Sequence, residues 1–303
     1  MSTSFADAGA SSAPFDVPGI LAAPLAVVRT QLQRSLRSMI VGPDAELRDI
    51  NAPRRDTGLF GPDSATWTVH ADAAMLIGGI RALLLQTLHP LAMAGIADHS
   101  QYRSDPTGRL HRTAGYVGTT TFGTRAEAKA AVRMVSRVHQ RVVGTAPDGR
   151  PYAANDPHLL AWVHHTLVES FYLAYQRYGA SPLVARDADR YIDEQAVLAK
   201  LIGAEPVARS VAELTHKMAE IRPELKATRD ARNAVRFLLF PPLAVQILPV
   251  YAVLASAAVG LLPAWARREL RIPRLPVTER FAVRPAAKIV TQTLGWAMTA
   301  PLT

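Results

Sequence analysis

TRAEAKAAVRMVSRVHQRVVG, residues 124–144, contains the clearest helix signals of the chain. Thr124 and Glu127 have the spacing of a capping box, in which each side chain accepts a hydrogen bond from the backbone N–H of the other residue. Gly144 is the residue type that often follows a helix end in the left-handed conformation. The stretch therefore predicts one well-defined amphipathic helix that ends near Gly144.

The apolar side of this predicted helix contains a histidine. His139 shares a stripe of three- and four-residue spacing with apolar residues, whereas arginines occupy the other side. The stripe consists of Ala128, Val132, Val135, His139 and Val142, and the other side carries Arg133, Arg137 and Arg141. We expect His139 to face the core, either as a histidine satisfied by a neighbouring carbonyl group or as a ligand of a metal or haem.

The composition restricts the chemistry of the chain. Its 303 residues include nine histidines and no cysteine. Disulfides, iron–sulfur clusters and cysteine nucleophiles are thereby excluded, and a metal has to be bound by histidines or carboxylates. The formal net charge is +9, but the basic residues are spread along helices and no nucleic-acid-binding motif occurs. We therefore expect no nucleic-acid partner.

The sequence predicts a leader followed by one helical domain. Residues 1–22 are small and polar and lack the basic and apolar regions of a secretory signal, so we expect a disordered leader and a cytoplasmic location. No stretch alternates between apolar and polar residues over several positions, as a half-buried strand would. Residues 23–303 are therefore predicted to form an all-α, single-domain helical bundle.

One uncharged run, Phe237–Ala266, is long enough to cross a bilayer. Four prolines interrupt it, and they break the run into short pieces. We therefore expect a buried helical hairpin or a segment that rests on a membrane surface, in preference to a transmembrane helix.

A long helix is predicted from Ser64 to Thr87, and its second half is apolar on nearly all sides. Gly78 and Gly79 lie inside it and cost roughly 1 kcal/mol each relative to alanine. Glycines that destabilise a helix are expected where another backbone or a flat ligand lies close to the helix, because a side chain would not fit there. Pro90 ends or kinks this helix and leaves His89 at its C-terminal end, where we expect a structural role.

Sequence motifs exclude several classes of enzyme. The chain has no zinc-protease motif, no paired Glu-x-x-His of di-iron bundles, no nucleophile elbow, no P-loop and no dinucleotide fingerprint. A single inward histidine on an apolar helix remains, and this arrangement suits an axial ligand of haem.

Polar residues upstream of His139 are candidates for the same site. Arg109 and Arg112 lie about one turn apart on a predicted short helix, where they either pair with anionic groups of a ligand or form a solvated face. Thr113 offers a hydroxyl group to a bound oxygen. In the loop before them, Asp98 and His99 are candidates for moving protons.

Six segments, in this order, resemble the mpaB/rubber-oxygenase catalytic-domain family. They are GLFGPDSATWTVHAD at 58–72, GGIRALLLQTLHPLAMAGIADHS at 78–100, DPTGRLHRT at 105–113, TTTFGTRAEA at 119–128, VHQRVVG at 138–144 and YAANDPHLLAWVHHT at 152–166. The resemblance extends from about Thr57 to about Arg274.

This resemblance implies an all-helical fold that encloses a b-type haem pocket. Family members include latex-clearing oxygenases, which cleave polyisoprene double bonds with dioxygen, and a fungal enzyme that oxidatively shortens a farnesyl side chain. It also implies that His139 is the proximal haem ligand. Gly78, Gly79 and Arg109 are further expected cofactor contacts, and iron is the expected metal.

The distal side departs from the family pattern. Latex-clearing members have an Arg-x-x-Lys-Thr motif, whereas this chain has Arg109, Arg112 and Thr113, with arginine in place of the lysine. Arginine remains charged and is not a releasable iron ligand. The family's distal glutamate has no counterpart here, and Asp98 or His99 occupies the corresponding segment.

The leading hypothesis is a haem b-dependent oxygenase that acts on a hydrophobic, isoprenoid-type substrate with dioxygen. A second hypothesis is a non-catalytic haem- or lipid-binding helical protein at the membrane surface. A third is a purely structural helical protein peripheral to membranes. An absorption spectrum and a vesicle-binding assay distinguish the three.

Overall fold

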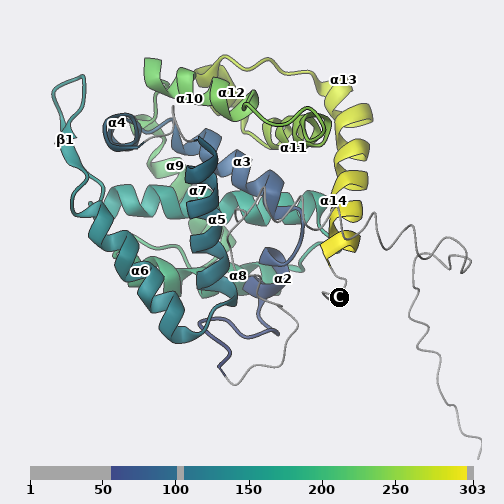
Figure 1. Ribbon diagram of the computed structural model, residues 1–303, viewed down its shortest axis with the longest axis horizontal. Coiled ribbons are helices and arrows are strands. Elements are labelled where there is room, and N and C mark those ends of the chain that lie inside the picture. Colours follow the sequence, from purple (N-terminus) through teal and green to yellow (C-terminus); the bar gives the residue numbers. More distant parts are fainter. Residues whose placement is uncertain (1–55, 101–105, 299–303) are drawn as a thin grey trace, which may run out of the picture.

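The computed structural model describes residues 56–100 and 106–298, and the predicted leader at residues 1–22 lies outside them. Helices make up most of the described chain, as predicted, with one short β-hairpin (Figure 1). The elements are α2 (Ala65–His70), α3 (Met75–Gln86), α4 (Pro90–His99), α5 (Pro106–Phe122), α6 (Arg125–His139), β1 (Val143–Thr145), β2 (Pro151–Ala153), α7 (Pro157–Tyr178), α8 (Ala185–Ile202), α9 (Val211–Glu220), η1 (Arg222–Glu224), α10 (Arg229–Leu239), α11 (Leu248–Gly260), α12 (Ala264–Leu270), α13 (Pro276–Thr278), η2 (Glu279–Val283) and α14 (Arg284–Met298).

Helices α3 and α7 pack against each other at the centre of the fold, and α11 packs on α3 (Figure 1). Apolar residues of both central helices are fully buried, among them Ile77, Leu84 and Trp162. Burial on all sides explains why α3 lacks a polar face. The predicted central buried helix is thereby confirmed.

Gly78 allows the close contact between these two helices. A Cβ atom at Gly78 would lie 2.7 Å from Cδ1 of Phe171 and 3.0 Å from the carbonyl oxygen of Ser170. No larger residue fits there without displacing α7. The sequence predicts that either a backbone or a flat ligand comes close to these glycines. At Gly78 the close neighbour is the backbone of α7. A Cβ atom at Gly79 would lie 4.0 Å from its nearest neighbour, Cε1 of Phe171.

The predicted single helix from Ser64 to Thr87 is wrong, because the chain breaks into α2 and α3. The reason is Asp72, whose carboxylate accepts hydrogen bonds from the N–H groups of Ala74 and Ala180, at 2.7 and 3.0 Å. It therefore satisfies backbone donors at the start of α3 and just beyond α7.

Local sequence signals predict two further helix ends, a start at Asp156-Pro157 and an end at Gly203, and the structure confirms both. Asp156 caps α7 by accepting from the N–H of His158 and Leu159, and Pro157 is the first helical residue. Gly203 ends α8 with φ +86°, a left-handed conformation that favours glycine.

The prediction for Gly144 is wrong, because α6 ends at His139 and Gly144 lies in strand β1. There it pairs with Tyr152 of the antiparallel strand β2. Strands of three residues are too short to produce a detectable alternation in sequence. The close contact between Gly144 and the Tyr152 ring explains the need for glycine.

The uncharged run Phe237–Ala266 divides into the end of α10, a connection, α11 and the start of α12. Within the described residues, no single helix has the length and apolar character to cross a membrane. Two pairs of consecutive helices pass that test together, but α3 and α4 are bent by 101° and α11 and α12 by 118°.

Candidate functional site

Helix α6 places His139 as the sequence predicts. Thr124 accepts from the N–H of Glu127, and the Glu127 carboxylate accepts from the N–H of Thr124 at 2.7 Å, which completes the capping box. Ala128 and Val132 are buried on the inward face, and Arg133 on the outward face is exposed. The end of this fixed helix therefore determines where the imidazole of His139 lies.

His139 is half-buried, and its buried Nδ1 atom has no hydrogen-bond partner among the described residues. Burial lowers the pKa of His139, so the imidazole is neutral near pH 7. A neutral imidazole with a free buried nitrogen is suited to metal ligation, because the lone pair is not occupied by a proton. The expectation of a satisfied core histidine does not hold for this nitrogen.

Helix α5 is longer than predicted. The sequence predicts a short helix around Arg109 and Arg112, whereas α5 continues through Thr119–Thr121 to Phe122. The Thr120 hydroxyl donates to the carbonyl oxygens of Tyr116 and Val117, and Thr121 bonds to Nδ1 of buried His70 at 2.7 Å. The hydroxyl groups of Thr120 and Thr121 are therefore hydrogen-bonded within the protein.

Helices α5 and α6 form a helical hairpin that closes at Gly123. In Figure 1 the two helices diverge from this turn, so the start of α5 and the end of α6 are the open ends of the hairpin. Arg109, Arg112 and Thr113 lie on the first turns of α5, and His139 lies at the end of α6. The side chain of Arg109 is outside the part of the chain that the structure describes. Arg112 is exposed and Thr113 is half-buried.

Asp98 and His99 at the end of α4 contact the β-hairpin that follows His139. Tyr152 donates from its hydroxyl to the Asp98 carboxylate at 2.5 Å, and Nε2 of His99 lies 3.1 Å from the carbonyl oxygen of Val143. Burial and the bond to Asp98 raise the pKa of Tyr152 to about 12, so the phenol remains protonated. These contacts connect α4 to the segment next to His139, and the proton-transfer roles stay predictions.

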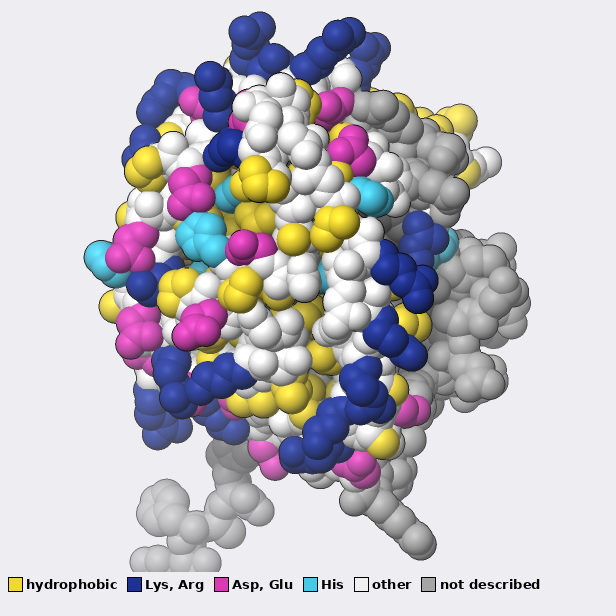
Figure 2. Space-filling view, turned by 90° about the vertical axis from the view of Figure 1, so that its left-hand side faces the viewer, with side chains coloured by type: hydrophobic (Ala, Val, Ile, Leu, Met, Phe, Trp, Pro, Cys, Tyr) yellow, Lys and Arg dark blue, Asp and Glu magenta, His cyan; other side chains and the backbone are white. Residues whose placement is uncertain are grey.

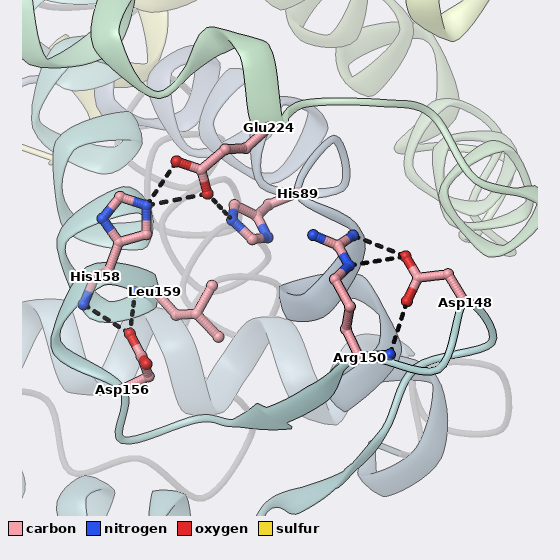
Figure 3. Close-up of polar contacts among 7 residues, drawn as sticks. All are labelled: His89, Asp148, Arg150, Asp156, His158, Leu159 and Glu224. Atoms are coloured by element: carbon pink, nitrogen blue, oxygen red, sulfur yellow. Dashed lines mark hydrogen bonds and ion pairs between the residues drawn. The ribbon is translucent and has the colours of Figure 1, made fainter.

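A second cluster of potential ligands lies where α3, α4, α7 and η1 meet (Figure 3). His89 lies at the bend between α3 and α4, His158 in the first turn of α7 and Glu224 at the end of η1. Nε2 of His158 is 2.9 Å from a carboxylate oxygen of Glu224, and Nε2 of His89 is 3.5 Å from the other. The three potential ligand atoms lie within 4.8 Å of one another.

The His89 side chain is only 1% exposed, and neither ring nitrogen makes a hydrogen bond within the described part of the chain. Burial lowers the pKa of His89, although the Glu224 carboxylate opposes this effect. Arg150, in the connection between β1 and β2, lies beside His89 and pairs with Asp148 at 2.8 Å (Figure 3). His89 is therefore a buried neutral imidazole that faces a carboxylate.

The sequence gives no spacing signal for this cluster. It predicts a structural role for His89 and assigns none to His158 or Glu224. The three residues are far apart along the chain, and only the packing of α4, α7 and η1 brings them together. A small cavity of ≈ 120 Å³ adjoins the cluster, lined among others by His158, Trp162, Lys217 and Glu224.

Basic side chains are dispersed over the side of the molecule that carries α4, α6 and β1. Figure 2 shows Lys and Arg around this face, interspersed with acidic and apolar groups. The molecule therefore presents no single basic patch on this face.

Comparison with known proteins identifies a family but no individual relative. The family model described as "ER-bound oxygenase mpaB/B'/Rubber oxygenase, catalytic domain" matches residues 67–292. No curated protein and no solved structure matches the chain. The matched region contains both the α5–α6 hairpin and the His89 cluster.

Proposed function

Because the chain belongs to the ER-bound oxygenase mpaB/B'/rubber oxygenase catalytic-domain family, we propose that it is a haem b-dependent oxygenase with a hydrophobic, isoprenoid-type substrate. Family membership gives the oxygenase activity. The haem, the dioxygen co-substrate and the substrate class are our proposals, and the residues of the α5–α6 hairpin support them.

The observation that carries the proposal is the environment of His139. Its imidazole is neutral, and Nδ1 is buried without a hydrogen-bond partner at the end of a well-capped helix. An unsatisfied buried nitrogen costs about 1–3 kcal/mol, a cost that ligation of the ring would offset. His139 therefore fits the role of a haem ligand, and haem held there would supply the iron for oxygen chemistry.

The first turns of α5 supply positive charge and a hydroxyl group. Arg109 and Arg112 would stabilise negative charge that develops on oxygen, and Thr113 would donate a hydrogen bond. A guanidinium is not a releasable iron ligand, so Arg112 would act through charge and hydrogen bonds.

Asp98 and His99 would move protons at the end of α4. The Tyr152 hydroxyl fixes the orientation of the Asp98 carboxylate, and the Val143 carbonyl oxygen contacts His99. Both side chains are exposed, so protons from solvent reach them directly.

An absorption spectrum of the purified protein tests the proposal. We expect a Soret band that is lost in His139→Ala and retained in His216→Ala, since His216 is an exposed histidine on α9. The haem-loaded protein should consume oxygen with an isoprenoid alkene. Failure to bind added haem would overturn the proposal, whereas haem binding without oxygen consumption would favour a non-catalytic carrier.

Exposed apolar side chains favour an additional contact with a membrane surface. Phe240 and Val245 before α11, and Phe281 in η2, are 78%, 76% and 69% exposed. We expect Phe240→Ser to reduce binding to anionic vesicles, and Val184→Ser, an exposed valine before α8, to leave it unchanged. Equal binding by both variants would argue against this contact.

A further inference from the structure

We propose that His89, His158 and Glu224 form a binding site for a divalent transition-metal ion of the zinc class. This site is separate from the proposed haem ligand His139 and does not depend on it. The argument rests on the donor atoms, their spacing and the environment of His89.

The spacing of the donor atoms approaches that of a coordinated ion. Zinc binds imidazole nitrogen and carboxylate oxygen at about 2.0–2.2 Å, so two ligands of a tetrahedral site lie roughly 3.4 Å apart. Nε2 of His89 is 3.5 Å from Glu224, and Nε2 of His158 is 2.9 Å from it. Insertion of an ion would require His158 and Glu224 to separate by about 0.5 Å. All three donor atoms already lie within 4.8 Å of one another, and the His158 and Glu224 side chains are 48% and 42% exposed.

The environment of His89 favours a metal over a simple ion pair. Nε2 of His89 is 3.5 Å from the Glu224 carboxylate, which is longer than the 2.7–2.9 Å of a typical charged hydrogen bond. Among the described residues, neither ring nitrogen of the buried His89 has a hydrogen-bond partner. A cation at the centre of the cluster would engage one of these nitrogens and would balance the charge of Glu224.

Rigid elements hold the ligands. Pro90 follows His89 at the sharp bend between α3 and α4, and Asp156 fixes the first turn of α7, in which His158 lies (Figure 3). Asp148 pairs with Arg150 and reduces the repulsion that this arginine would exert on a bound cation.

The donor set defines the class of ion. Two imidazoles and one carboxylate suit zinc and similar first-row ions, whereas magnesium and calcium prefer oxygen ligands. Three protein ligands leave one tetrahedral position unfilled, as in catalytic zinc sites. The cavity beside His158 and Glu224 provides room at that position for water or a small anion.

Titration of the full-length protein, free of any polyhistidine tag, with Zn²⁺ and Co²⁺ tests this site. We expect one ion per chain by calorimetry, with the visible absorption of tetrahedral Co²⁺, and a rise in melting temperature with Zn²⁺. His158→Ala and Glu224→Gln should abolish all three effects. Both replace largely exposed side chains, so loss of binding can be separated from loss of folding by circular dichroism.

Two controls make the test specific. His216→Ala removes the histidine of the surface pair with Glu220 and should leave Zn²⁺ binding intact. His139→Ala should also retain Zn²⁺, which separates this site from the proposed haem site. An unchanged Zn²⁺ affinity in His158→Ala, or an equal rise in melting temperature with Mg²⁺, would overturn the proposal.

Discussion

Arg81 of α3 and Glu169 of α7 form an ion pair in the centre of the fold, with Nη2 2.8 Å from Oε2. The arginine is 2% exposed, and its other nitrogens donate to the Ser170 hydroxyl and to the carbonyl oxygen of Leu261. One side chain therefore connects α3 to α7 and to the bend that follows α11.

Removal of one partner of this pair should be strongly destabilising, because the other charge remains without its counterion. We expect Glu169→Ala to lower the free energy of unfolding by about 3–5 kcal/mol, measured by urea denaturation. Asp148→Ala, which breaks the exposed pair with Arg150, should leave it nearly unchanged. Similar effects of the two substitutions would contradict the central role of Arg81.

Alanine substitutions at Gly78 and Gly79 should have opposite effects. A Cβ atom at Gly78 would contact Phe171 at 2.7 Å, so Gly78→Ala should cost roughly 1–3 kcal/mol. At Gly79 the nearest atom is 4.0 Å away, and the better helix propensity of alanine should stabilise the protein by up to about 1 kcal/mol. Thermal unfolding of both variants checks this prediction.

The Gly79→Ala variant also tests the predicted contact between Gly79 and the cofactor. If Gly79 lies against haem, Gly79→Ala should weaken haem binding even though the apoprotein becomes more stable. Haem titration followed at the Soret band measures this effect. Unchanged affinity would remove Gly79 from the cofactor site.

The free energy of unfolding should fall as the pH decreases below about 6.5. Burial lowers the pKa of His70 from its ordinary value of 6.5 to about 3, so between these values the unfolded chain binds a proton that the folded chain does not. This contribution is present in full above pH 6.5 and is lost at about 1.4 kcal/mol per pH unit as the pH falls toward 3. His164 and His165, with pKa values lowered to about 3 and about 4, add to the slope.

Urea denaturation at several pH values should therefore give a shallower pH dependence for His70→Asn than for the unchanged protein. The variant should also be less stable at pH 7, because it loses the contacts with Thr121 and Tyr191. An identical slope would indicate that folding does not lower the pKa of His70.

Asp98 should affect turnover without affecting haem binding. Asp98→Asn removes the proposed proton carrier, and Tyr152→Phe removes the hydrogen bond of 2.5 Å that orients it. We expect both variants to retain the Soret band and to consume oxygen more slowly. Full activity of Asp98→Asn would exclude a role for this carboxylate in proton transfer.

Features determined by a few neighbouring residues could be predicted from the sequence. The capping box of Thr124 and Glu127, the Asp156 cap and the left-handed Gly203 each depend on local backbone geometry, and the structure confirms them. The inward face of α6, including His139, follows from helical periodicity in the same way.

Features that depend on distant contacts could not be predicted. The break between α2 and α3 depends on the bond from Asp72 to Ala180, and the position of Gly144 depends on pairing with Tyr152. The cluster around His89 likewise has no local signature. Side chains of this kind meet only after α3, α4 and α7 have packed.

The contacts between α4 and the β-hairpin have a topological consequence. His99 bonds to the Val143 carbonyl oxygen, so the chain leaves and rejoins the rest of the fold at adjacent points on either side of α5 and α6. This excursion packs on the rest of the fold through contacts of α5 with α2 and of α6 with α8, and through the bond of Thr121 to buried His70. Arg109, Arg112, Thr113 and His139 all lie on it. Entry of a bulky cofactor between α5 and α6 would therefore also disturb their contacts with α2 and α8.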